Sequence, residues 1–189
     1  AYARAQEQYA AHGITTIQDG MAVEEMFPMY QMLLDSGILK LDLVVYPSPQ
    51  AYDAAAERFG ALPPERHLRI GGMKVYLDGS PQGRTAWMRE PYAGEADYRG
   101  YGTMEDAALE EAMELACLRR TQLLCHCNGD GAAEQFLRCL ARVEQKHPEM
   151  AQLRPVIIHG QLLAPDQLPR VKELGAVVSF FVAHVYHWG

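Results

Sequence analysis

The sequence predicts an α/β protein whose core is a parallel β-sheet. Strand-like and helix-like segments alternate along the 189 residues, and most of the strand-like segments are apolar throughout. Such strands are typical of a sheet covered on both faces, and the repeated βα order favours parallel strands joined by right-handed crossovers. A chain of this length can bury one sizeable core.

Six strands are expected, each a short apolar run bounded by polar or turn-forming residues. Their ranges are 14–18, 41–46, 70–77, 122–126, 155–159 and 176–183. Helical runs are expected before the first strand and between the others, near residues 1–11, 22–36, 49–59, 104–120, 131–146 and 166–174.

Several helix ends carry signals of their own. Gly37 and Gly175 follow helical runs, as C-terminal glycines do. Thr103 and Asp106 have capping-box spacing, and Asp130 is expected to cap the helix that follows it. The pattern alone fits either an open doubly wound sheet or a (β/α) barrel. The turn after the first strand has no Gly-rich phosphate loop, which disfavours a dinucleotide-binding sheet.

Composition and charge disfavour several classes of partner. The formal net charge of −7 argues against nucleic acid, because binding phosphates requires clustered Lys and Arg. No apolar stretch reaches about 18 residues, so no membrane-spanning helix is expected. The four cysteines lie in strand or helix patterns and are expected to be reduced and buried, as in a cytoplasmic protein. The chain begins inside a helical run, and we expect it to be a piece of a larger protein.

An irregular segment interrupts the βα rhythm between residues 79 and 102. A loop of this length inside a compact domain is usually functional, commonly as a lid or a binding loop. Trp87, Tyr92, Tyr98 and Tyr101 supply packing residues that a disordered insertion lacks. We therefore expect the loop to fold over a site.

Two histidines end the two clearest strands. His126 closes the run that begins at Gln122, His159 closes the run that begins at Pro155, and one helical run separates them. Neighbouring parallel strands end at the same edge of a sheet, so the two imidazoles should converge there. A converging pair favours a divalent metal site over two separate structural histidines.

Other side chains at this edge could also carry chemistry. Lys74 lies in an apolar strand, where a buried ammonium needs a role or a partner such as Asp19. If burial lowers its pKa, the neutral amine could form a carbamate or a Schiff base. Asp78 ends the same strand as a functional carboxylate or a turn residue. Arg84 could bind a substrate carboxylate or hold the loop, and His184 follows the last strand.

These motifs together resemble those of the metal-dependent amidohydrolases of family 3. The residues Lys74-Val-Tyr-Leu-Asp-Gly-Ser80 resemble that family's K-x-x-x-D-G-S, and His126-Cys-Asn-Gly-Asp-Gly-Ala132 resembles its H-A-x-G-D-x-A. Further matches follow in the family's order at residues 12–19, 83–86, 91–92, 158–161 and 178–184. The resemblance covers nearly the whole chain.

The resemblance implies a TIM-barrel type (β/α)₈ fold that is incomplete here, with about six of the eight βα units. Residues 1–189 would then form a partial barrel domain with a loop insertion at about 79–102. It implies one or two divalent ions, most often zinc, held by Lys74, which is often carboxylated, and by His126 and His159. Asp78, Arg84 and His184 would contact substrate. The metal, which this fragment need not retain, would activate water and polarise the scissile carbonyl.

The chain also departs from the family's pattern. The family's His-x-His pair on strand 1 and its strand 8 aspartate, the usual proton shuttle, would lie outside this chain, so no catalytic residue is assigned. Ile158 stands where the family has Glu, Gly160 where it has Ala, and Phe181-Val182 where it has Gln-Pro. These changes remove a carboxylate and alter a site wall, so the identity of the substrate is not inferred.

The sequence therefore predicts a piece of a metal-dependent hydrolase that cleaves an amide-type, non-peptide C–N bond of a small molecule. The isolated chain is expected to be inactive. Two alternatives stay open: a Schiff-base lyase or aldolase that uses Lys74, and a non-catalytic fragment whose histidines are structural. An incomplete barrel would leave strand edges unpaired, which favours a homo-oligomer.

Overall fold

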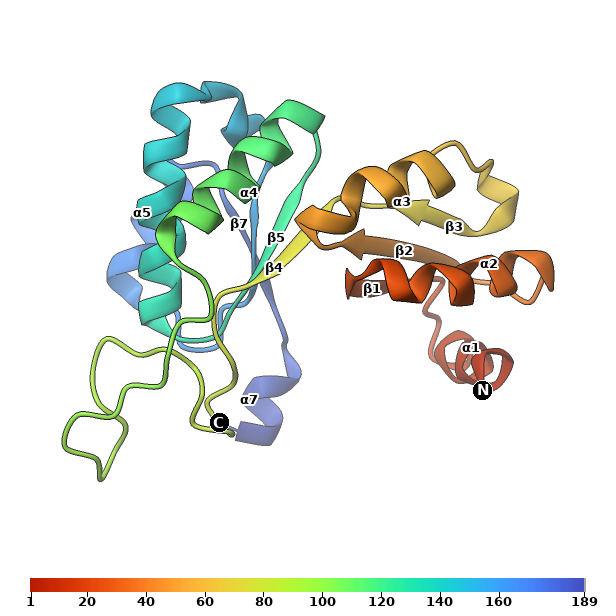
Figure 1. The fold of residues 1–189 in the computed structure, drawn as a ribbon. Coiled ribbons are helices and arrows are strands. Elements are labelled where there is room, and N and C mark those ends of the chain that lie inside the picture. The colour runs from red at the N-terminus through yellow and green to blue at the C-terminus, as the bar shows by residue number, and fades with distance from the viewer. Residues whose placement is uncertain (189) are drawn as a thin grey trace. The chain divides into compact units, whose positions relative to one another are not determined.

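The computed structural model describes residues 1–188 (Figure 1). The chain divides into two compact units, one of residues 1–74 and one that begins at Val75. A sheet lies in each unit, and the strands pair in parallel along β1-β2-β3 and along β5-β6-β7. The predicted α/β class with parallel strands is therefore confirmed.

The first unit holds a three-stranded sheet in the order β1-β2-β3. Its strands are β1 (Thr16–Ala22), β2 (Asp42–Pro47) and β3 (Leu68–Ile70). Its helices are α1 (Tyr2–Ala11), α2 (Phe27–Asp35) and α3 (Tyr52–Phe59), with 3₁₀ turns η1 (Glu24–Met26), η2 (Pro49–Ala51) and η3 (Pro64–Arg66). The central strand β2 is buried from its second residue onward, which explains its continuous apolar run.

An aromatic cluster forms the centre of the first unit's core. The ring of Phe59 meets those of Phe27 and Tyr30 edge to face, with centroids 5.5 and 6.1 Å away. Such edge-to-face pairs add to the stabilisation that burial alone provides. The Tyr30 hydroxyl donates a hydrogen bond of 2.9 Å to Oδ2 of Asp19. Helix α2 is thereby joined to β1, the strand that carries Asp19.

The second unit is organised around a four-stranded sheet in the order β4-β5-β6-β7. Its strands are β4 (Met73–Tyr76, which begins in the last residues of the first unit), β5 (Leu123–Cys127), β6 (Val156–His159) and β7 (Val177–Phe180). Its helices are α4 (Asp106–Arg119), α5 (Asp130–Lys146), α6 (Leu168–Glu173) and α7 (Ala183–Trp188), with 3₁₀ segments η4 (Pro148–Leu153) and η5 (Pro165–Gln167). The segment at 79–102 is irregular, as predicted.

Two predicted strands differ from the structure. The strand expected at 70–77 is two strands, β3 and β4, which belong to different sheets. A Cβ on Gly71 would lie 2.5 Å from Cγ1 of Val44, so only glycine fits where the chain leaves β3. The strand expected at 176–183 ends at Phe180, opposite the last residue of β6, and α7 begins at Ala183.

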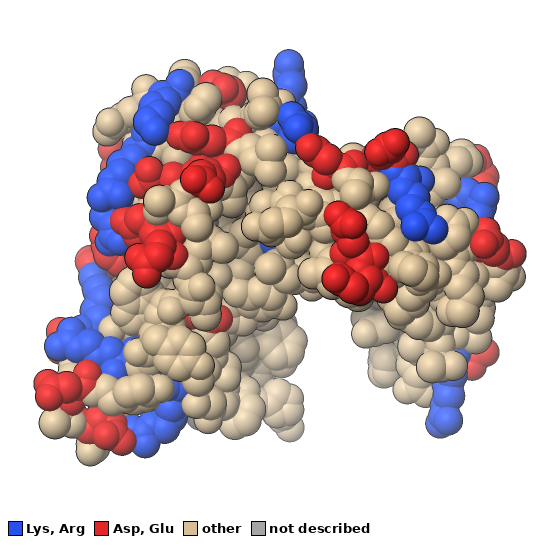
Figure 2. Space-filling model, in the orientation of Figure 1, with Lys and Arg blue, Asp and Glu red and all other residues tan. Residues whose placement is uncertain are grey.

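Ion pairs join the outer surfaces of α4 and α5. Figure 2 shows acidic and basic side chains interspersed over these helices. Asp106 accepts from Arg138 at 2.8 Å and from Arg142 at 3.1 Å, and Glu114 pairs with Lys146 at 3.0 Å. Positive charge on α5 is thus matched by carboxylates of α4 and leaves no basic stripe there for phosphates.

The Asp106 carboxylate should make stability sensitive to acid. The Arg138 guanidinium holds the pKa of Asp106 down at about 2. Because this is below the value of about 3.9 in an unfolded chain, the ionised form stabilises the fold above pH 4. That contribution is lost as the pH falls towards 2. We expect Asp106→Asn to lower the free energy of unfolding by about 1 kcal/mol at pH 7, after solvent screening. Urea unfolding at pH 7 and pH 2.5 tests this, and equal destabilisation at both would contradict it.

Two further expectations concern cysteines and membrane spans. Cys117, Cys125, Cys127 and Cys139 are all free and buried, as predicted. Within residues 1–188, no helix combines the length and the apolar character that crossing a bilayer requires.

Candidate functional site

Three histidine rings lie in a row in the second unit. His126 on β5 and His159 on β6 end neighbouring parallel strands, and their ring centroids are 4.7 Å apart. His184 lies in α7 rather than at a strand end, and its centroid is 6.0 Å from that of His159. The expected convergence of the two strand-end imidazoles is therefore present, and the structure adds the third predicted histidine to them.

The His126 ring is held in one orientation by backbone. Its Nε2 lies 2.9 Å from the Gly79 carbonyl oxygen, and its side chain is 14% exposed. When Nε2–H donates this bond, Nδ1 keeps its lone pair. Histidines that ligate metals commonly donate their other ring N–H to a carbonyl or carboxylate. The arrangement thus leaves a nitrogen able to ligate a metal.

Asn128 adds polar atoms beside the same ring. Its Nδ2 donates to the Gly79 carbonyl at 2.7 Å and lies 3.2 Å from Nε2 of His126. Its Oδ1 is buried and has no hydrogen-bond partner within the described part of the chain. A buried acceptor of this kind is one that a bound ligand or water satisfies. Asn128 was not among the predicted site residues, and its position after the strand-end histidine was the only signal for it.

The backbone at His159 is strained. Its φ is +78°, a region that residues with a side chain rarely adopt. The next residue, Gly160, has a φ of +53°, and its N–H donates to the Cys127 carbonyl at 3.0 Å. A Cβ on Gly160 would lie 2.8 Å from Cγ1 of Val178. Strained residues persist where the surroundings over-determine them, and they cluster at functional sites.

Asp78 anchors three chain segments with one buried carboxylate. Its Oδ1 accepts from the Asn128 N–H at 2.9 Å, and its Oδ2 accepts from the N–H groups of Gly129 at 2.7 Å and Trp87 at 3.0 Å. Burial raises the pKa of Asp78 above its usual value, and the three N–H groups and His126 act in the opposite direction. Its side chain therefore joins the strand end, the long loop and the turn before α5.

The long loop packs directly against the N-terminus of α5. The Trp87 carbonyl accepts from the N–H groups of Gly131 at 2.9 Å and Ala132 at 3.3 Å. These N–H groups belong to the first turn of the helix, which has no intrahelical acceptors for them. Gly129 is the N-cap, whereas the Asp130 carboxylate accepts from Arg89 of the loop and does not cap the helix, which corrects the sequence expectation.

Gly129 should tolerate no side chain. A Cβ there would lie 2.0 Å from the Trp87 carbonyl oxygen, a backbone atom that cannot move aside cheaply. We expect Gly129→Ala to lower the free energy of unfolding by about 3 kcal/mol. Gly83→Ala in the long loop is the matched control, since the nearest atom to its Cβ would be Ser80 Oγ at 3.3 Å. Urea unfolding measures the free energy of unfolding of both variants. A small loss of similar size in both would contradict the close packing at Gly129.

Arg84 and Lys74 occupy different surroundings. Arg84 lies in the loop, where its guanidinium pairs with Glu95 at 2.7 Å and lies over the ring of Tyr92. Lys74 is half-buried in the first unit, and its Nζ would be 2.8 Å from a Cβ on Gly20, so the glycine makes room for it. Among residues 1–188, no third His, Cys, Asp or Glu completes a ligand group with His126 and His159. Their metal-binding role stays a prediction.

Comparisons with known proteins give one consistent result. A family model described as the amidohydrolase family matches residues 1–189. The Bacillus subtilis (strain 168) protein YtcJ, which is named as an amidohydrolase, is 27% identical over 125 residues. That match covers 65% of this chain and 23% of YtcJ.

Solved structures agree with this result. An uncharacterised metal-dependent hydrolase from Pyrococcus furiosus matches with a TM-score of 0.82 at 28% identity, over 98% of this chain and 38% of that one. A similar hydrolase from Pyrococcus horikoshii OT3 gives 0.80 at 27%, over 97% and 36%. This chain thus spans less than two fifths of the length of each. The matches confirm the predicted fold class, an α/β fold of the (β/α)-barrel type.

Proposed function

This chain belongs to the amidohydrolase family, and on that premise we propose that its protein hydrolyses an amide-type C–N bond of a small molecule with a divalent metal. The observation that carries the proposal is the row of His126, His159 and His184, in which the Gly79 carbonyl fixes the first ring. The likeness to metal-dependent hydrolases supports the dependence on metal. The amide-type bond is our inference from the family.

Zinc suits the donor set on these strands. His126 and His159 would hold it, because imidazole nitrogens are ligands that zinc prefers. Lys74 would be a third ligand if its amine is carboxylated to a carbamate. When bound, such an ion lowers the pKa of a water molecule and polarises a carbonyl group. We further propose that residues 1–189 are part of one hydrolase domain, since the family match crosses both units.

The chain's own residues would position and shield the reactants. The Gly79 carbonyl and Asp78 keep the His126 ring and the strand end in place. The loop, which is anchored by Asp78, would limit access of water from its side of the sheet edge. His184 lies next to His159, where it would orient a polar group of the substrate, and the exposed guanidinium of Arg84 would attract an anionic one.

The proposal is tested on the longer protein that contains this chain and on the chain alone. Each is depleted of metal, reloaded with zinc and offered a panel of N-acyl amino acids and cyclic amides. We expect zinc-dependent hydrolysis by the longer protein and none by the chain alone, since within residues 1–188 no third His, Cys, Asp or Glu completes a ligand group with His126 and His159. Hydrolysis that survives metal depletion would contradict the dependence on metal. Turnover by the chain alone would contradict the expected inactivity of the isolated chain.

Association and location are also part of the proposal. Large apolar side chains are exposed at and after the edge strand β7, namely Phe180, Phe181, Val182, Val185, Tyr186 and Trp188. We propose that they bind another copy or another part of the protein, and a monodisperse monomer by light scattering would argue against self-association. The free, buried cysteines support a cytoplasmic location.

A further inference from the structure

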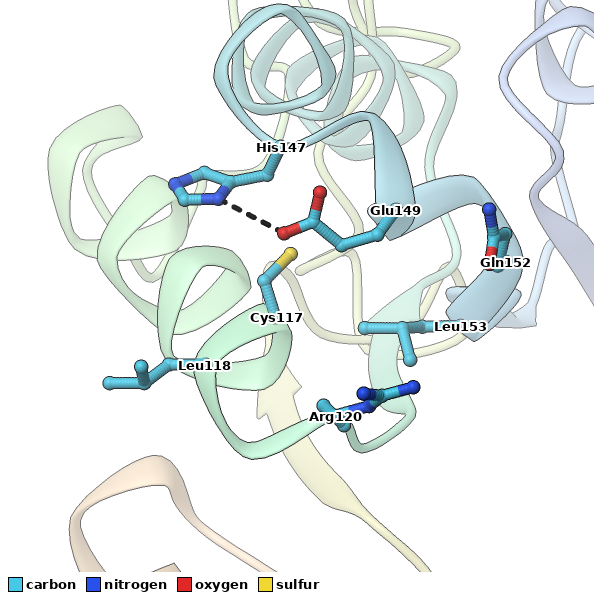
Figure 3. Close-up of a pocket in the computed structure, with 7 residues that line it drawn as sticks. All are labelled: Cys117, Leu118, Arg120, His147, Glu149, Gln152 and Leu153. Atoms are coloured by element: carbon cyan, nitrogen blue, oxygen red, sulfur yellow. Dashed lines mark hydrogen bonds and ion pairs between the residues drawn. The ribbon is translucent and has the colours of Figure 1, made fainter.

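A pocket of about 490 Å³ lies where the end of α4 faces η4 (Figure 3). The chain runs from α4 into β5 and from η4 into β6, so the pocket is at the N-terminal ends of these strands. His126 and His159 are at the opposite ends. The pocket is therefore separate from the proposed hydrolase site and needs its own explanation.

Three potential metal ligands meet in this pocket. Cys117 comes from the last turn of α4, His147 follows α5, and Glu149 lies in η4. Their ligand atoms all lie within 4.8 Å of one another. Figure 3 shows the Cys117 sulfur pointing towards the Glu149 carboxylate, with the His147 ring beside it. Thiolate, imidazole and carboxylate are the three side-chain ligands that zinc takes.

The spacing of two donors already suits a tetrahedral ion. His147 Nδ1 and Glu149 Oε1 are 3.3 Å apart. Two light donors about 2.0–2.1 Å from zinc, at a tetrahedral angle, are separated by about 3.3–3.4 Å. The Cys117 Sγ lies within 4.8 Å of both of these donor atoms. Its Sγ is 3.4 Å from Sδ of the buried Met150, so its present neighbours are soft atoms.

Local charge also favours a cation. The carboxylates of Glu149, Glu114 and Glu144 all lie close enough to act electrostatically on the Cys117 thiol. Glu144 Oε1 is buried and has no hydrogen-bond partner in the described part of the chain. Binding of a dication would offset this negative charge, with the thiol proton released to solvent.

A second cluster of ligand atoms lacks these properties. Asp106, Glu110 and Cys139 also lie close together. Their carboxylates, however, are bound by the guanidinium groups of Arg138 and Arg142, which neutralise them and occupy their oxygens. A cation there would have to displace two arginines. This cluster therefore provides a matched control.

We propose that Cys117, His147 and Glu149 bind one zinc ion, with a water molecule in the fourth position on the pocket side. The ion links the end of α4 to η4. It lies at the N-terminal ends of β5 and β6, whereas the hydrolase site lies at their C-terminal ends. Its role is structural, because it joins the two connections that lead into β5 and β6. The proposal does not depend on the proposed hydrolase function.

The test uses the full chain, depleted of metal and titrated with Co²⁺ as a spectroscopic probe for zinc. We expect a thiolate-to-cobalt charge-transfer band that saturates at one equivalent and disappears in Cys117→Ser. Cys139→Ser, the control from the second cluster, should keep the band. His126→Asn with His159→Asn should also keep it, which separates this site from the hydrolase site.

Glu149→Gln and His147→Asn keep the test valid if Cys117→Ser fails to fold. Their side chains are exposed or half-buried, so these substitutions should leave the fold intact. Each is expected to weaken Co²⁺ binding at least tenfold. Zinc should also raise the melting temperature of the wild type but not that of Cys117→Ser. Absence of the band in the wild type, its persistence in Cys117→Ser, or unchanged affinity in both guard variants would overturn the proposal.

Discussion

Replacing His126 and His159 together with asparagine is expected to remove the hydrolase metal and to lower kcat/KM at least about a thousandfold, since a bound metal contributes several kcal/mol to catalysis. The two rings are 4.7 Å apart at the ends of adjacent strands, so no neighbouring side chain replaces both. The measurement combines elemental analysis for zinc with kinetics on the longer protein. Both are made in a Cys117→Ser background, so that zinc at the other pocket is not counted.

The controls for this prediction separate metal binding from substrate binding. His12→Asn, an exposed histidine of the first unit, should change neither zinc content nor rate. His184→Asn should keep the zinc and raise KM, because His184 lies beside His159 and not on a strand. Full zinc content in the double variant would show that these histidines are structural.

Replacing Asp78 with alanine is expected to lower the free energy of unfolding by about 3–5 kcal/mol. The substitution leaves the N–H groups of Asn128, Gly129 and Trp87 without their acceptor, in a place that water does not reach. Urea unfolding of the chain measures the loss. Asp97→Ala, an exposed aspartate of the same loop, should change it by less than about 0.5 kcal/mol. A loss this small for Asp78→Ala would contradict the role of the carboxylate as an anchor.

The same carboxylate gives a pH dependence of known sign. Burial raises the pKa of Asp78 in the folded chain above the unfolded value of about 3.9. The folded state therefore holds this proton more tightly, and the resulting stabilisation is present below pH 4 and is lost as the pH rises through the raised pKa. Wild type compared with Asp78→Asn should show this decline from pH 4 upward. A difference that grows with pH would contradict it.

Hydrophobic pattern predicted most of the fold, because burial on both faces of a sheet leaves an unbroken apolar run. The ranges expected for β2, β5 and β6 agree with the structure to within a residue or so. The pattern could not show that Gly71 interrupts one run, since the close approach of Val44 is visible only in three dimensions. It also missed α7, which follows β7 where no further partner strand is present in the sheet order.

The parts of the candidate site that depend on strand topology were predictable from the sequence. The parts that depend on contacts with main-chain atoms were not. The convergence of His126 and His159 follows from two parallel strands that end together. The contact of His126 with the Gly79 carbonyl, and the three N–H groups around Asp78, involve main-chain atoms that a sequence does not distinguish. His147 was not among the predicted site residues, because the η4 turn that brings it close to Cys117 had no recognised signal in the sequence.

The anchoring of the long loop has a consequence for how such a protein diversifies. The Trp87 backbone is fixed by Asp78 and by the start of α5, and the Met88 N–H donates to the Arg99 carbonyl at 2.7 Å. The ends of the segment 89–98 therefore meet, as in a compact Ω-loop. Insertions and deletions between residues 90 and 97 would leave this anchor and the contact of Arg89 with Asp130 undisturbed. The length and sequence of the loop tip can thus vary without disturbing the backbone contacts that hold its ends.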